Sequence, residues 1–159
     1  VRGSGWVAAA GLSLSHGAND AQKSMGVIAA LLLASGQTTT MSVPLWVKVL
    51  TGLALTTGTA LGGWRIVKTI GQRIFSLTPI DSIASQTSST AIILSASLIG
   101  APVSTTQVVA SSVVGVGGGR RRWKHVSWQI VREMGIAWLT TIPAAALMAV
   151  AVLILWRAL

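Results

Sequence analysis

The chain has 159 residues, of which 52% are apolar and only 9% are charged, and its formal net charge is +9. A soluble domain usually carries about 25% charged residues, and a small domain has a large surface to cover with polar groups. The composition therefore excludes an ordinary soluble domain and favours one that lipid surrounds. There is no cysteine, which excludes disulfides, thiolate catalysis and thiolate metal sites.

The basic residues stand in short clusters between long uncharged stretches, notably Arg65, Lys68 and Arg73, and then Arg120, Arg121, Arg122 and Lys124. A nucleic-acid-binding domain instead gathers its bases on a polar face. Clusters beside apolar runs are typical of the cytoplasmic flanks of membrane segments. We therefore expect a lipid bilayer, and no nucleic acid, as a partner.

The first predicted element is a broken membrane helix over residues 6–34. Its two ends are apolar, but its middle, residues 15–23, carries hydroxyl, imidazole, amide, carboxylate and ammonium groups. A continuous helix over the 28 residues 6–33 would be about 42 Å long, well beyond the roughly 30 Å hydrocarbon core. We expect a break near Gly17, with Asn19 and Asp20 as N-caps of a half-helix that begins around Ala21.

Residues 43–64 form the second predicted element, a membrane span. Lys48 lies near one end of this span, where its long side chain can reach the headgroups. The following residues, 65–78, are basic and amphipathic. They predict a connector that lies at the membrane interface.

A helical hairpin is predicted over residues 81–118. The uncharged stretch 82–119 contains thirteen Ser or Thr residues, and Gly100 and Pro102 mark a tip near its middle. So many hydroxyls indicate that the hairpin is buried against protein or faces a watery cavity. Either full crossing or re-entry of the two arms is compatible with the sequence.

A basic loop, residues 119–125, and a last span, residues 128–156, complete the chain. Pro143 lies inside the apolar run of this span, so a kink is expected there.

Three crossings place nine basic residues on one side of the membrane and two on the other, and the positive-inside rule assigns the nine to the cytoplasm. An odd number of crossings means that a second copy of this unit in one chain would insert upside down, as in inverted-repeat transporters. The predicted fold is an all-α integral membrane protein, one repeat of an inverted-repeat transporter. We expect a multi-pass plasma membrane protein, a fragment of a longer chain, whose partner is the other half or a second copy.

Asp20 is the first candidate site residue, because an ionisable group inside a membrane segment is expensive and usually functional. With the amide oxygen of Asn19 it could bind a coupling cation, either sodium or a proton. Lys23 lies three residues later on the same helical face, so an alternative is that Asp20 only caps the helix and pairs with Lys23. No organic cofactor is expected.

Ser104, Thr105 and Thr106 are the second candidate cluster. They stand where the second arm of the hairpin begins, so their hydroxyls and the free backbone N–H groups meet at the positive end of a helix dipole. Such a site can bind an oxyanion. The alternative is an ordinary Ser/Thr N-cap. Four further residues are predicted to surround the two clusters: His16, Gln22, Lys23 and Gln107.

Residues 15–26, which read SHGANDAQKSMG, resemble the second-half signature of the PiT inorganic phosphate transporter family. Residues 102–106, PVSTT, resemble the hairpin-tip motif of that family, and residues 62–65, GGWR, which precede a basic segment, are also similar to it. The resemblance implies two inverted repeats that enclose phosphate and coupling cations near the midplane. It also implies that Asn19 and Asp20 bind the coupling ion, and that the hydroxyls of residues 104–106 bind phosphate.

Two residues depart from the family pattern. Gln107 stands where the family commonly has histidine, and glutamine cannot titrate near neutral pH. Asp81 stands where a more neutral residue is expected, and we interpret it as a helix cap.

The sequence thus predicts phosphate transport by cation-coupled symport with alternating access, and no enzymatic activity. Three alternatives remain open at this stage. They are a sulfate permease of the same superfamily, a membrane enzyme acting on phosphorylated lipids through His16 and Asp20, and a non-transporting membrane subunit.

Overall fold

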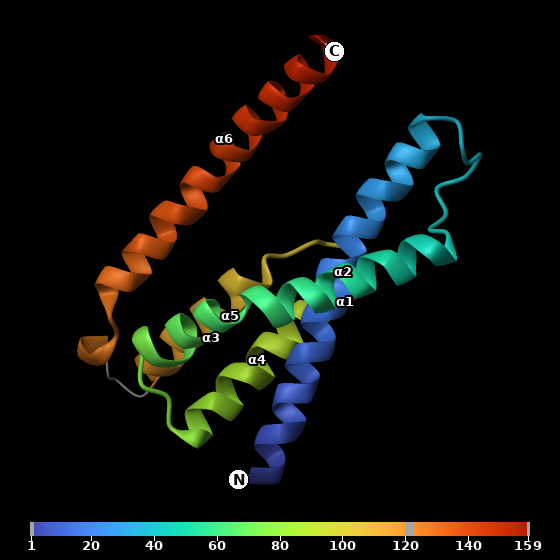
Figure 1. The fold of residues 1–159 in the computed structure, drawn as a ribbon. Coiled ribbons are helices and arrows are strands. Elements are labelled where there is room, and N and C mark those ends of the chain that lie inside the picture. The colour runs from blue at the N-terminus through green and yellow to red at the C-terminus, as the bar shows by residue number, and fades with distance from the viewer. Residues whose placement is uncertain (1, 120–122, 159) are drawn as a thin grey trace. The chain divides into compact units, whose positions relative to one another are not determined.

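The computed structural model describes residues 2–119 and 123–158, and the secondary structure that these residues form is helical. Two compact units are present, residues 1–126 and residues 127–159, and each is described by itself. Figure 1 shows the helices in chain order. They are α1 (Arg2–Ala34), α2 (Leu45–Gly62), α3 (Trp64–Lys68), the π-helical η1 (Thr69–Arg73), α4 (Pro79–Leu98), α5 (Thr105–Gly119), the 3₁₀ turn η2 (Trp123–His125) and α6 (Trp128–Ala158).

The predicted break in the first helix is wrong. Helix α1 runs without interruption through Gly17 over 33 residues, about 50 Å at 1.5 Å per residue. Asn19 and Asp20 therefore lie in the interior of a helix and cap nothing. The physical reason is that the hairpin supplies hydrogen-bond partners to the polar side chains in the middle of α1, so the backbone does not need to unwind to satisfy them.

Helix α2 lies in the segment predicted as a span, and it packs against α1. Only Val47 and Thr51 of this helix are buried. Apart from the half-buried Leu55, its other apolar side chains are exposed, as is expected of a helix that faces lipid or a further protein segment.

The connector after α2 is anchored by apolar residues as well as being basic. After α3 and η1 the chain leaves the helical conformation, and Ile74 and Phe75 there are 0% and 3% exposed. η1 contacts α5, and Phe75 lies close to Gly117 of that helix. The connector is therefore attached to the second arm of the hairpin.

Helices α4 and α5 form a hairpin in the predicted place. Helix α4 begins with a capping box in which Asp81 accepts hydrogen bonds from the backbone N–H (3.0 Å) and hydroxyl (2.7 Å) of Thr78. The interpretation of Asp81 as a helix cap is thereby confirmed. At the tip, Gly100 has a φ of 72°, a conformation that glycine adopts without strain.

Hydroxyl groups tie the two arms of the hairpin together. Ser112 Oγ of α5 lies 2.6 Å from Ser85 Oγ and 2.8 Å from Ser89 Oγ, both of which belong to α4. Ser85 and Ser89 are almost fully buried. Some of the hydroxyls that predicted burial against protein therefore bond to each other within the hairpin. The hairpin also packs against α1 through α4.

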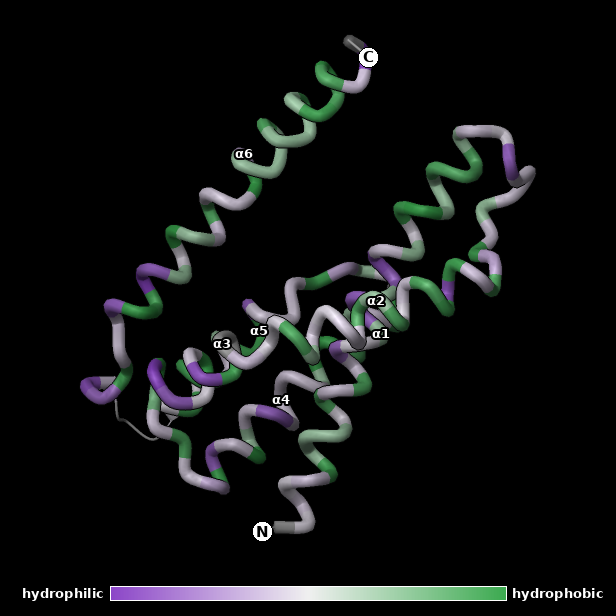
Figure 2. Tube along the Cα trace, viewed as in Figure 1, coloured by the Kyte–Doolittle hydropathy of each residue, from purple (hydrophilic) through white to green (hydrophobic). Residues whose placement is uncertain are grey.

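Helix α6 forms the second unit and continues through Pro143 over 31 residues. Figure 2 shows hydrophobic residues along most of it. Within the described residues, α2 and residues Trp128–Arg157 of α6 are long and apolar enough to cross a membrane. The kink at Pro143 and a crossing by α1 stay predictions. Of the predicted basic loop, residues 120–122 lie outside the described part of the chain.

Candidate functional site

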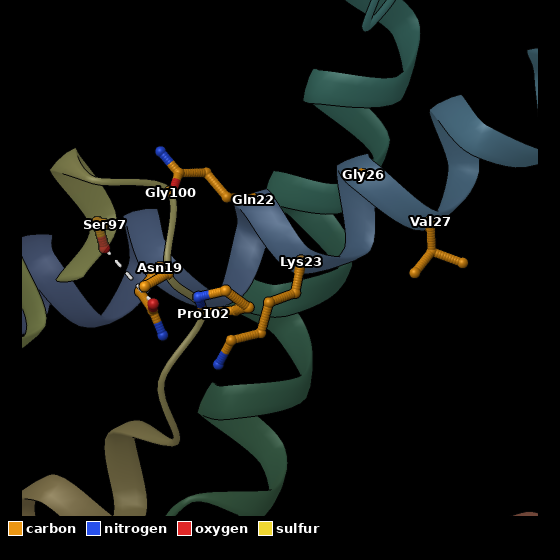
Figure 3. Close-up of a pocket in the computed structure, with 9 residues that line it drawn as sticks. Asn19, Gln22, Lys23, Gly26, Val27, Ser97, Gly100 and Pro102 are labelled. Atoms are coloured by element: carbon orange, nitrogen blue, oxygen red, sulfur yellow. Dashed lines mark hydrogen bonds between the residues drawn. The ribbon is translucent and has the colours of Figure 1, made fainter. Parts of the chain in front are cut away.

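The middle of α1 meets the tip of the hairpin, and this contact brings the two candidate clusters together. Asn19 is 2% exposed. Its Nδ2 donates to the carbonyl oxygen of Val103 at 2.9 Å and to Asp20 Oδ1 at 3.1 Å, while its Oδ1 accepts from Ser97 Oγ at 3.5 Å. Figure 3 shows Asn19 directed from α1 toward Ser97 of α4, with Lys23 and Pro102 beside it.

Asp20 contacts three further side chains besides Asn19. Lys23 Nζ donates to its Oδ1 at 2.9 Å, and His16 Nε2 lies 3.4 Å from its Oδ2. Thr105 Oγ1 of the hairpin donates to Oδ2 at 3.3 Å. These contacts join a carboxylate in the middle of α1 to the first residue of α5, 85 positions later in the chain.

The backbone carbonyl of Val103 is the meeting point of the two α1 donors. Lys23 Nζ donates to it at 2.5 Å, and Asn19 Nδ2 donates to it as well. Sequence reasoning missed this carbonyl because it looked for side chains. Its position directly before the three hydroxyl residues is the one signal that the sequence offers.

The predicted anion-binding residues differ in their surroundings. Ser104 is exposed and its Oγ accepts from the backbone N–H of Gln107 at 3.4 Å, which makes it the N-cap of α5. Thr105 is 3% exposed and contacts Asp20. Thr106 is half-buried and lines the cavities described next. The N-cap interpretation is thus correct for Ser104, whereas Thr105 and Thr106 face α1 or a cavity.

Two neighbouring cavities lie on one side of Asp20. The first, about 600 Å³, is bounded by α1, α2 and α5, and the second, about 300 Å³, extends toward α4. His16, Val67 and Thr106 line both, so the two cavities meet there. Sequence reasoning missed the wall that α2 contributes to the first cavity. Gly58, Thr59 and Gly62 line this wall, and the spacing of four between the glycines is a signal of an open helix face.

A third cavity, of about 460 Å³, lies at the tip of the hairpin. Asn19, Gln22 and Lys23 line it from α1, and Gly100 and Pro102 line it from the tip (Figure 3). The structure therefore places Gln22 near the site.

Gln107 was predicted to lie near the site, but its exposed side chain lines a different cavity. This cavity is about 340 Å³, and α4 and α5 alone form it.

The chemistry of the contact suits ions of both signs. A carboxylate, a backbone carbonyl and hydroxyls are the oxygen ligands that hard cations prefer. Hydroxyls at the start of α5 are donors suited to an oxyanion. Within the described residues there is no group of three His, Cys, Asp or Glu side chains that could hold a metal ion.

Comparison with known proteins agrees with the motifs. The profile of the "Phosphate transporter family" matches residues 2–149. A Bacillus subtilis protein named "Probable low-affinity inorganic phosphate transporter" is 42% identical over 141 residues, which are 88% of this chain and 42% of the relative. Proteins of the same name from Mycobacterium tuberculosis, strain H37Rv (46% over 138 residues, 86% of this chain and 33% of the relative) and Rhizobium meliloti (41% over 143 residues, 89% and 42%) also match.

The chain therefore spans well under half the length of these relatives. No solved structure matches it. The names of the family and of these relatives describe transporters and not enzymes. Because the family profile covers nearly the whole chain and includes all three motifs, this chain belongs to the phosphate transporter family.

Proposed function

We propose that this chain forms half of the translocation site of an inorganic phosphate transporter in the cell membrane. The observation that carries the proposal is the 3.3 Å contact between Thr105 of the hairpin and Asp20 of α1. This contact joins an acid in a predicted membrane segment to the hydroxyl cluster of residues 104–106, and the chain belongs to the phosphate transporter family. An acid placed in a membrane segment at a helix–hairpin contact is costly unless function requires it.

In this proposal the anion binds at the hairpin tip, to Ser104, Thr105 and Thr106. The cavity beside Asp20 reaches Thr106, so phosphate can approach these hydroxyls along α2. Neutral donors would hold the anion without a fixed charge that would trap it.

A positive charge at Asn19 and Asp20 would complete the loaded site. Opposite charges that neutralise each other cost less to carry through a medium of low dielectric constant. This is the physical basis of the cation-coupled symport with alternating access that we propose, with sodium or a proton as the coupling ion. The other half of the site comes from a second, inverted repeat in a longer chain or from a second copy.

The test is uptake of radiolabelled phosphate by cells that lack their own phosphate transporters and express the full-length protein containing this sequence. Asp20→Asn keeps the shape of the side chain and removes its charge. Since hydrogen bonds to charged groups contribute about 1.5–3 kcal/mol, uptake should fall by about tenfold or more. Thr105→Val, which removes only the hydroxyl, should lower uptake as well.

Thr57→Val is the matched control, because the Thr57 hydroxyl is exposed and bonds to the backbone of its own helix. It should leave uptake unchanged. Unlabelled sulfate in excess should not compete with phosphate. Normal uptake by Asp20→Asn at equal membrane abundance would contradict the proposal, and competition by sulfate would point to a sulfate permease instead.

A further inference from the structure

The ammonium group of Lys23 occupies the place at the contact between α1 and the hairpin where a bound cation would be expected. Its Nζ lies 2.9 Å from Asp20 Oδ1 and 2.5 Å from the carbonyl oxygen of Val103. One oxygen belongs to the helix and the other to the tip of the hairpin, 80 residues later than Lys23. The Lys23 ammonium thus links α1 to the tip of the hairpin.

The oxygen atoms around the Lys23 ammonium do not form a binding site for a sodium ion. The Asn19 amide presents its Nδ2 hydrogens to the same two oxygens, at 3.1 and 2.9 Å, and its own oxygen faces Ser97 instead. A hard cation prefers about six oxygen ligands and cannot use an amide nitrogen. Asp20 Oδ1 and the Val103 carbonyl already accept from the ammonium and the amide, and Asp20 Oδ2 already accepts from Thr105, so the contact leaves a sodium ion too few oxygen ligands.

Electrostatics leads to the same conclusion. A sodium ion bound to Asp20 Oδ1 or to the Val103 carbonyl would lie a few ångströms from the Lys23 ammonium, and two like charges at that separation repel each other. Lys23 is only partly exposed, with 35% of its side-chain surface accessible. Solvent therefore screens this repulsion only in part.

We infer that Lys23 is a built-in cation that neutralises Asp20 and takes the place of a sodium ion in this half of the transporter. The inference rests on the proposed function and narrows it: with Lys23 present, sodium is excluded at Asn19 and Asp20, which leaves the proton as the coupling ion there. It predicts that sodium has no binding place here as long as Lys23 is present. Removal of the ammonium should open one.

The experiment uses the full-length protein purified in detergent and reconstituted in vesicles, with choline replacing sodium. Lys23→Ala removes the ammonium and leaves space for an ion. Lys23→Arg keeps the charge, and Lys23→Met keeps most of the volume but has no charge. Lys68→Ala, at an exposed lysine of the connector, is the matched control. The wild type sets the baseline, since any effect of sodium elsewhere in the protein is common to all variants.

The first measurement is the midpoint of thermal unfolding with and without sodium, which needs no transport. Lys23→Ala should show a sodium-dependent rise beyond that of the wild type, whereas Lys23→Arg and Lys68→Ala should match the wild type. An equal sodium effect in Lys23→Ala and the wild type would overturn the inference. If Lys23→Ala does not reach the membrane, Lys23→Ser, which adds an oxygen, takes its place.

The second measurement is phosphate uptake by the vesicles. Lys23→Ala should lose most of its uptake in choline and recover part of it in sodium, whereas Lys23→Met should be low in both. Uptake by Lys23→Ala that is equally high in both media would also overturn the inference. A wild type that does not take up phosphate would refute the proposed function, but the unfolding measurement would still decide the role of Lys23.

Discussion

Replacing Asn19 tests whether the contact between α1 and the hairpin tip stabilises the protein as well as shaping the site. The Asn19 side chain is 2% exposed, and its strongest contact outside α1 is the 2.9 Å hydrogen bond to the Val103 carbonyl. In Asn19→Ala this carbonyl still accepts from Lys23, so no buried acceptor is left without a partner. The loss should therefore be that of an ordinary hydrogen bond, about 0.5–1.5 kcal/mol, and not the larger cost of an unsatisfied group.

The small void left by the shorter side chain adds to this loss. With a void term below about 1 kcal/mol, the total destabilisation is about 0.5–2.5 kcal/mol. For a domain of 150–250 residues, each kcal/mol lowers the unfolding midpoint by about 2–4 °C, so the expected fall is about 1–10 °C. Asn19→Asp should lower it further, because it replaces the donor to Val103 with a second carboxylate beside Asp20.

The assay is thermal unfolding of the detergent-solubilised protein, followed by the loss of its monodisperse peak in size-exclusion chromatography. Thr57→Val is the control, because it removes an exposed hydroxyl that bonds to the backbone of its own helix, away from Asn19. Its effect should stay within about 0.5 kcal/mol. An Asn19→Ala variant as stable as the wild type, or a Thr57→Val variant that loses as much, would refute this reasoning.

Three further substitutions test other parts of the fold. Gly58→Leu should fill the cavity beside Asp20 and reduce phosphate uptake, because Gly58 lines this cavity and a Cβ added there would meet nothing within 4 Å. A Cβ at Gly52 is equally uncrowded, but Gly52 lines none of the described cavities, so Gly52→Leu should leave uptake unchanged. Gly117→Leu should lower the unfolding midpoint, since even a Cβ there would come within 2.8 Å of a side chain from the segment after α5. A Cβ at Gly115 meets nothing within 4 Å, so Gly115→Leu should be tolerated. Asp81→Ala removes the two hydrogen bonds that the Asp81 carboxylate accepts from Thr78 and should cost about 0.5–2 kcal/mol in thermal unfolding. An unchanged midpoint would mean that this carboxylate contributes nothing to the cap.

The sequence by itself determined the features that depend on neighbouring residues. Apolar runs without charges identified α2 and α6, and Gly100 with Pro102 located the tip of the hairpin, because backbone preferences at a turn are local. The cap at Asp81 is local as well, since its partner is three residues away. The motifs around Asp20 and Thr105 were sufficient to predict the family, which the profile match confirmed.

Only the tertiary structure decided how these pieces meet. The polar middle of α1 indicated a break when the helix was considered alone, but Asn19 and Asp20 find partners on the hairpin more than 80 positions away, and the helix stays continuous. The Val103 carbonyl carries no sequence signature of its own. The orientation of Gln107 toward another cavity likewise depends on how α5 packs. Local patterns determine which groups need partners, but long-range packing determines which partners they obtain, and so whether Lys23 or a dissolved ion provides the positive charge beside Asp20.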